Sequence, residues 1–222
     1  MGLDKIDKPK PLAKIALDAL RRSILSNELT PNVVYNEKAL AQSLGISRTP
    51  VREALLELSS KRLVRFLPQK GVIINTFSDK DIEEVFEIRT ALELFSINKI
   101  CNSTQKLDSS SLKKCLDDQR EAFRNNAPVE FMDADRALHI GFTALTRNEY
   151  LLEMMQGIRD IMHLMGFRAL DIDGRMQEVV TEHEKILAAV EQKDSQAAME
   201  QMENHLNISK EAVKKMKHNE ET

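Results

Sequence analysis

The chain has 222 residues, of which 42% are apolar and 30% are charged, and its formal net charge is -3. This length allows one large or two small domains with a buried core. The sequence has no run near the roughly 18 apolar residues that a membrane span needs, and its start lacks the apolar core of an export signal. We therefore expect a soluble, cytoplasmic protein.

Charge is divided unevenly along the chain. Residues 1–78 carry 13 Lys and Arg against 7 Asp and Glu, a net charge of +6, so the remainder carries -9. The asymmetry favours a polyanion as the partner of the first part, although two solvated surfaces of arbitrary sign would also produce it. Cys101 and Cys115 lack the spacing of a metal site and are expected to be reduced thiols.

Three short helices are predicted after a charged, proline-bearing segment, residues 1–11, that we expect to be a disordered tail. The first has one apolar face, formed by Ala13, Ala16, Leu17, Leu20, Ile24 and Leu25. The second covers Glu37–Leu44 and ends at Gly45, a natural left-handed position. Ser47 is predicted to cap the third helix, which carries Pro50 in its first turn. The buried stripe of the third helix is Val51, Ala54, Leu55 and Leu58.

A small hairpin is predicted next, because "LVRFL" and "GVIIN" are two β-rich runs separated by "PQK". Three helices and a hairpin make a winged helix-turn-helix domain. Arg48, Thr49 and Arg52 lie off the buried stripe, at the end of a recognition helix that contacts base edges and phosphates. Lys70 and Gly71 at the hairpin tip are expected to lie against the DNA backbone or the minor groove. The alternative is that the arginines are merely solvated.

The stretch "LAQSLGISRTPVREALLEL", followed by "KRLV" and "QKG", resembles the DNA-binding domain of GntR-type transcription regulators. The resemblance covers about residues 12–76. It implies that Arg48, Thr49, Arg52 and Gly71 match operator-contacting positions, and that Lys38 is a weaker match because an arginine often stands there. A palindromic operator read by a homodimer is the expected arrangement.

From Ser78 onward the pattern is one long amphipathic segment after another. Six helices are predicted, and their short connections favour an antiparallel bundle. We assign residues 77–218 to this all-helical domain and residues 219–222 to a tail. The predicted breaks are near residues 101–108, 125–128, 147, 171–174 and 193.

One aspartate and three histidines of the second domain have spacings that suit a metal site. Asp135 and His139 lie one helical turn apart on one face. His183 and His205 lie at similar distances on either side of the predicted break near residue 193, so a helical hairpin would bring them to the same height. This ligand set suits zinc, nickel, manganese or iron(II) and leaves positions for water or a carboxylate.

Ordinary core or surface roles for these histidines are the alternative. His163, which has no spaced partner, and His218, which lies in a charged segment, are interpreted in that way.

The segment from about residue 79 to 216 resembles the FCD effector-binding domain of the FadR branch of these regulators. The resemblance rests on "EIRTALE", on the Asp-x-x-x-His spacing and on "EHEKILAAVEQKDSQAAMEQMENHL". It implies one divalent transition metal per chain, most simply zinc, held by Asp135, His139, His183 and His205. It also implies an organic acid as effector, bound at or near the metal.

Arg89 is the candidate for a second contact to the effector's carboxylate. An ion pair between Arg89 and Glu93, four residues apart on one helix, is an equal alternative. The expected function is a homodimeric, ligand-responsive transcription regulator, a repressor and not an enzyme. Two alternatives are a regulator that senses the metal itself and a metalloenzyme fused to a DNA-binding domain.

Overall fold

The computed structural model of the chain describes residues 11–26 and 28–221. It divides into two compact units, with the boundary between Thr76 and Phe77. Apart from Pro11, the predicted N-terminal tail lies outside the described residues. Within the described ranges, none of the helices combines the length and the apolar character that crossing a membrane requires. Each unit is described by itself below.

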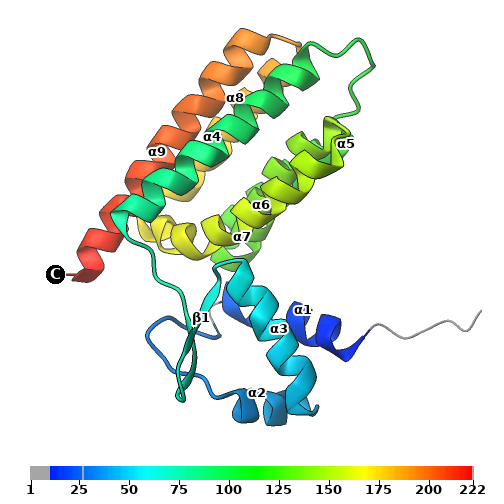
Figure 1. The fold of residues 1–222 in the computed structure, drawn as a ribbon. Helices are drawn as coiled ribbons and strands as arrows, with labels where there is room; N and C mark the ends of the chain where they lie inside the picture. Colours follow the sequence, from blue (N-terminus) through cyan, green and yellow to red (C-terminus); the bar gives the residue numbers. More distant parts are fainter. Residues whose placement is uncertain (1–10, 27, 222) are drawn as a thin grey trace, which may run out of the picture. The chain divides into compact units, whose positions relative to one another are not determined.

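The first unit is a winged helix-turn-helix, as the sequence predicts (Figure 1). Its elements are α1 (Leu12–Leu25), α2 (Glu37–Leu44), α3 (Arg48–Ser60), β1 (Val64–Leu67) and β2 (Gly71–Ile74). The two strands pair antiparallel, with Val64 opposite Ile74. The predicted stripe of α3 is buried and is 2% exposed or less at each of its four positions.

The helix ends of this unit differ from the sequence prediction in one detail. Gly45 ends α2 with a φ of 66°, as predicted. Ser47 occupies the N-cap position of α3, but its side chain makes no hydrogen bond to the helix, so the predicted capping bond is absent. A capping bond is present at the start of the other helix, α2. There the side chain of Asn36 accepts a hydrogen bond from the backbone N–H of Lys38 at 2.8 Å. Since that bond satisfies a helix N–H that has no partner within the helix, it stabilises the start of α2.

The second unit contains six α-helices, as predicted, and one short 3₁₀ segment within the described residues. Its elements are α4 (Asp79–Cys101), α5 (Ser110–Arg124), α6 (Pro128–Leu145), α7 (Glu149–Gly166), η1 (Phe167–Asp171), α8 (Arg175–Glu191) and α9 (Ser195–Glu221). Arg147 and Lys193 adopt positive φ at the predicted breaks. Helix α9 continues to Glu221, into residues that the sequence analysis assigned to a tail.

Helix α9 packs along α4 and α8, while α5 packs on α6 (Figure 1). The apolar core between them includes side chains that are 1% exposed or less: Ile97, Leu112, Phe131, Leu138, Phe142, Ile186, Val190, Met202 and Leu206. Cys101 and Cys115 are free thiols, as expected. Among the buried polar side chains of the same bundle are Arg89, Glu93, Gln119, Asp135, His139, Arg159, His183 and His205. Because buried polar groups are costly without partners, their contacts define the candidate site.

Candidate functional site

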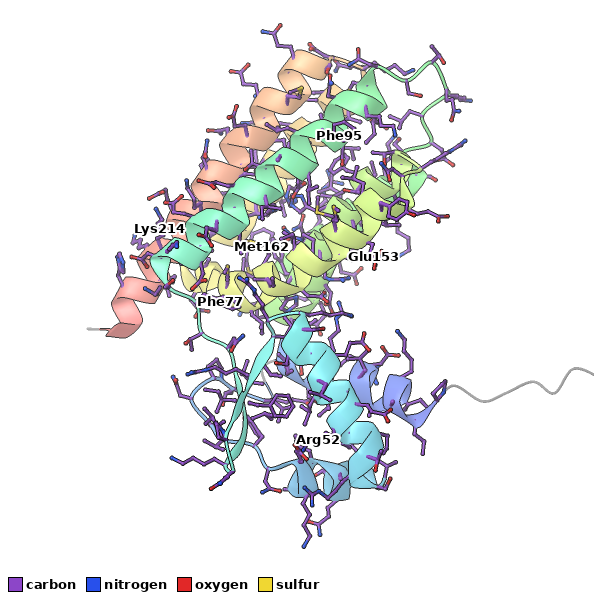
Figure 2. All side chains as sticks on the ribbon, in the orientation of Figure 1. Arg52, Phe77, Phe95, Glu153, Met162 and Lys214 are labelled. Carbon is purple, nitrogen blue, oxygen red and sulfur yellow. The ribbon has the colours of Figure 1, made fainter. Side chains whose placement is uncertain are left out.

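The recognition helix α3 presents its predicted side chains at its start. Arg48 and Arg52 have side chains that are 64% and 60% exposed, and Figure 2 shows Arg52 on this helix. Glu37 of α2 holds both arginines, accepting from Arg48 Nη2 at 3.4 Å and from Arg52 Nη1 at 3.0 Å. Thr49 lies between them and is exposed. The two guanidinium groups are therefore positioned side by side and remain accessible.

Glu37 was missed by the sequence analysis, since only the packing of α2 on α3 brings it to the arginines. Lys38 and Lys70 are exposed. Gly71 has a φ of 134°, and a Cβ added there would lie 2.2 Å from the carbonyl oxygen of Tyr35. This close approach is a structural reason for glycine at position 71, and its contact with DNA stays a prediction.

The four predicted metal ligands converge inside the second unit. The Nε2 atoms of His183 and His205 are 3.4 Å apart. Asp135 Oδ1 lies 3.7 Å from His183 Nε2 and 3.8 Å from His139 Nε2. Because zinc binds nitrogen and oxygen at about 2.0–2.2 Å, two ligands of one tetrahedral ion lie roughly 3.4 Å apart. The spacing of the three histidines fits one divalent ion, and Asp135 Oδ1 lies beside two of them.

Two carboxylates orient two of the histidines. His139 Nδ1 lies 2.6 Å from Glu93 Oε2, and His205 Nδ1 lies 2.6 Å from Glu182 Oε2. An ionised carboxylate only accepts hydrogen bonds, so each Nδ1 carries the proton and each Nε2 keeps its lone pair. Carboxylates in this position are typical of histidine ligands of metals. Both imidazoles are therefore in the tautomer that a metal requires.

Gln119 orients the third histidine, because its Oε1 lies 2.8 Å from His183 Nδ1. Burial lowers the pKa of His183 to about 3, with a further contribution from His205. Burial also lowers the pKa of His139 and of His205. All three imidazoles are neutral at pH 7, which is the form that binds a metal.

Two arginines contact the same cluster. Arg89 donates from Nε to Glu93 Oε1 at 2.8 Å and from Nη2 to His139 Nε2 at 3.0 Å. The ion pair between Arg89 and Glu93, left open by the sequence, is therefore present. Arg159 of α7 donates from Nη2 to Asp135 Oδ2. Burial raises the pKa of Asp135, but the surrounding positive charge, that of Arg159 above all, outweighs burial and keeps that pKa below its usual range.

A pocket of about 50 Å³ adjoins the cluster. Its polar lining includes Arg89, Asp135 and Arg159, and its apolar lining includes Met132 and Met162; Met162 is labelled in Figure 2. This volume has room for a few atoms, such as those of one carboxylate group. The pocket therefore joins a candidate metal site to two guanidinium groups.

Several residues of this site were not predicted. Arg159, Gln119 and Glu182 come from three different helices, and the last two contact histidines that are 64 and 23 residues away in sequence. No local spacing marks these pairs, so the sequence alone holds no signal that reveals them. The spacing of Asp135 and His139 was local and could be predicted.

Comparisons with known proteins match both units. The family profile of bacterial regulatory proteins of the gntR family matches residues 12–74, and that of the FCD domain matches residues 84–208. The chain is 26% identical over 211 residues to the HTH-type transcriptional regulator YdhC of Bacillus subtilis, covering 95% of this chain and 94% of that protein. It is 22% identical over 213 residues to the HTH-type transcriptional repressor RspR of Escherichia coli, covering 96% and 93%.

A solved structure of a GntR transcriptional regulator from Rhodococcus sp. RHA1 has the same fold, with a TM-score of 0.83. It is 21% identical and covers 90% of this chain and 96% of its own. These relatives are transcription regulators and not enzymes, so the alternative of a metalloenzyme is set aside. The gntR profile matches the first unit and the FCD profile matches the second. The chain therefore belongs to the GntR family of bacterial regulatory proteins and carries an FCD domain.

Proposed function

We propose that this GntR-family regulator is a repressor whose affinity for its operator is controlled by a small organic acid bound beside a metal ion in the FCD domain. The observation that carries the proposal is the convergence of Asp135, His139, His183 and His205 next to a pocket lined by Arg89 and Arg159. A bound divalent ion supplies positive charge and open coordination positions for a carboxylate. Arg89 is the protein group assigned to that carboxylate, and zinc is the simplest choice of metal.

The DNA-binding half of the proposal rests on the first unit. Arg48, Thr49 and Arg52 are assigned to base edges and phosphates of the major groove. Lys70 and Gly71 at the hairpin tip are assigned to the DNA backbone or minor groove. Lys38 on the second helix is assigned a further operator contact. The exposure of both α3 arginines supports this assignment. The operator is proposed to be palindromic and the protein to act in the cytoplasm.

A homodimer is proposed because a palindromic operator presents two equivalent half-sites. Ile88 and Phe95 of α4, seven residues apart and so on one helix face, are each 52% exposed. Apolar side chains of this size favour burial against another chain. Control by the acid then requires different acid affinities in the two dimer arrangements, and a coupling of about 1–3 kcal/mol would be enough.

Metal content tests the site. Purified protein is expected to contain about one divalent ion per chain, and His183→Ala or His205→Ala should lose it together with thermal stability. His218→Ala is the matched control, because that side chain is 59% exposed and lies against Asp79. If protein prepared without chelators contains no metal and takes up none, the proposed site is wrong.

Operator binding tests the effector. It is measured with and without an acid identified by thermal-shift screening, for metal-loaded, metal-stripped and Arg89→Ala protein. Stripping the metal should abolish the response, and Arg89→Ala should weaken it while metal content stays near one per chain. A full response in the stripped protein contradicts metal-mediated binding, and an undiminished response in Arg89→Ala removes that residue from the effector site.

A second candidate function is a regulator that senses the metal itself, without any organic acid. The small pocket volume of about 50 Å³ favours it, because this space holds only a few atoms. Titration of operator affinity with metal alone separates the two: a full response without acid supports metal sensing.

A further inference from the structure

Arg89 and a metal ion would compete for one atom. Arg89 Nη2 donates to His139 Nε2 at 3.0 Å, and His139 Nδ1 is engaged by Glu93. A neutral imidazole has a single acceptor nitrogen, with one lone pair. His139 Nε2 therefore cannot accept from Arg89 and bind a metal at the same time.

The surrounding charges increase this competition. Arg89 and Arg159 are each 2% exposed and line the same pocket. Burial lowers the pKa of Arg89, and the positive charge of Arg159 lowers it further. A divalent ion would add more positive charge beside two guanidinium groups that water screens poorly. An anion in the pocket would relieve this repulsion.

Arg159 has no such conflict. It donates to Asp135 Oδ2, whereas Asp135 Oδ1 is the oxygen that faces His139 and His183. Its Nε is buried without a hydrogen-bond partner in the part of the chain that the structure describes. Arg159 can therefore keep Asp135 in place through Oδ2 while Oδ1 stays available to a metal.

We propose that Arg89 is an exchangeable residue: it gives up His139 Nε2 when a metal binds there, and its released N–H group then binds the carboxylate of the ligand. This exchange rests on the proposed function, to which it adds a coupling between the two ligands. Arg89 keeps its second hydrogen bond to Glu93 throughout, so the guanidinium turns without leaving the site. The metal and the carboxylate then each increase the affinity for the other, by the same factor.

The test compares two variants that differ only at Arg89. Removing Arg89 alone would leave Glu93 as a buried carboxylate without its arginine. We therefore compare Glu93→Gln with Arg89→Met/Glu93→Gln. The glutamine oxygen can still accept from His139 Nδ1, as Gln119 does from His183 in this chain. Arg120→Met is the control for charge, since Arg120 pairs with Glu184 and Asp117, outside the cluster.

Zinc affinity is measured by competition with a chromogenic chelator, with and without malonate as the carboxylate probe. Without malonate, Arg89→Met/Glu93→Gln should bind zinc about tenfold more tightly than Glu93→Gln, because no charge-assisted hydrogen bond has to be broken. Malonate should tighten zinc binding about fivefold or more in wild type, in Glu93→Gln and in Arg120→Met. Its effect on the double variant should be much smaller, because only the metal itself remains there to hold the carboxylate.

Two results overturn the exchange: equal zinc affinities of the two variants without malonate, or an equal effect of malonate on both. Either leaves the proposed metal site intact. A wild-type chain that takes up no zinc removes the proposed function and the exchange together. Zinc uptake by Glu93→Gln itself reports that the substituted bundle still forms the site.

Discussion

Gln119 and His183 are joined by a 2.8 Å hydrogen bond between Oε1 and Nδ1, although 64 residues separate them in sequence. Both side chains are 0% exposed. Because the bond fixes the imidazole ring and its proton, it leaves His183 Nε2 directed at Asp135 and His205. Gln119 of α5 thus determines which ring nitrogen of His183, on α8, carries the proton and which can bind a metal.

Gln119→Leu is expected to weaken zinc binding about tenfold or more, the usual effect of removing the hydrogen-bond partner of a metal-binding histidine. Competition with a chelator measures this affinity. Gln196→Leu, at an exposed position of α9, makes the same chemical change away from the site. Equal zinc affinity in the two variants would contradict the role given to Gln119.

Arg48→Ala and Arg52→Ala are each expected to weaken operator binding by about 1–3 kcal/mol, because an arginine can hold two acceptors of one guanine. The operator would be identified by selection from random duplexes, and binding measured at fixed salt. Lys61→Ala is the control: it removes one positive charge just after the other end of α3, where Lys61 pairs with Glu57. If Lys61→Ala weakens binding as much, the arginines contribute only through general charge.

Gly71→Ala should destabilise the winged helix-turn-helix by roughly 3 kcal/mol or more, since the new Cβ would collide with the Tyr35 carbonyl at a strained φ. Gly45→Ala is the comparison. Its φ is 66°, but nothing lies within 4 Å of an added Cβ, so only about 1–2 kcal/mol is expected. Urea unfolding followed by circular dichroism measures both. Equal losses would argue against the close approach at Gly71.

The stability of metal-stripped protein should fall as the pH is lowered from 7 to 5. The folded-state pKa of His183 is lowered to about 3 from an ordinary value of 6.5. Below pH 6.5 the unfolded chain therefore binds a proton that the folded chain does not, which favours unfolding. Over this interval His183 alone should contribute a loss of about 2 kcal/mol.

Urea unfolding at the two pH values checks this sign and size. His183→Asn should reduce the difference between pH 7 and pH 5 by about the contribution of one histidine. A variant that loses as much stability as the wild type over this interval would show that folding does not lower the pKa of His183.

Much of the fold could be predicted because its signals are local. The apolar stripe of α3, the left-handed Gly45 and the break at Lys193 each depend on neighbours within a few residues. Asp135 and His139 were found for the same reason, because four residues are one helical turn. His183 and His205 required one more assumption, a hairpin bending between them, and the structure brings their Nε2 atoms to 3.4 Å.

The residues that were missed depend on tertiary packing. Arg159 reaches Asp135 because α7 packs on α6, and Glu37 reaches Arg52 because α2 packs on α3. Neither pair has a separation in sequence, such as three or four residues on one helix, that would identify it as a contact. Ser47 shows the opposite failure: its residue type and position suit a cap, yet its hydroxyl makes no such bond. Sequence preference alone cannot decide between rotamers of an exposed serine.

The deep burial of His139, His183 and His205 also affects how long a bound metal ion would stay in the site. The three side chains are between 0% and 2% exposed, so water has little access to replace them on an ion held by their Nε2 atoms. Release of such an ion is therefore expected to be slow compared with the diffusion of a small molecule to the adjoining pocket. An ion here would remain through many cycles of ligand arrival and departure, and the rapid variable sensed by the protein would be the concentration of the acid.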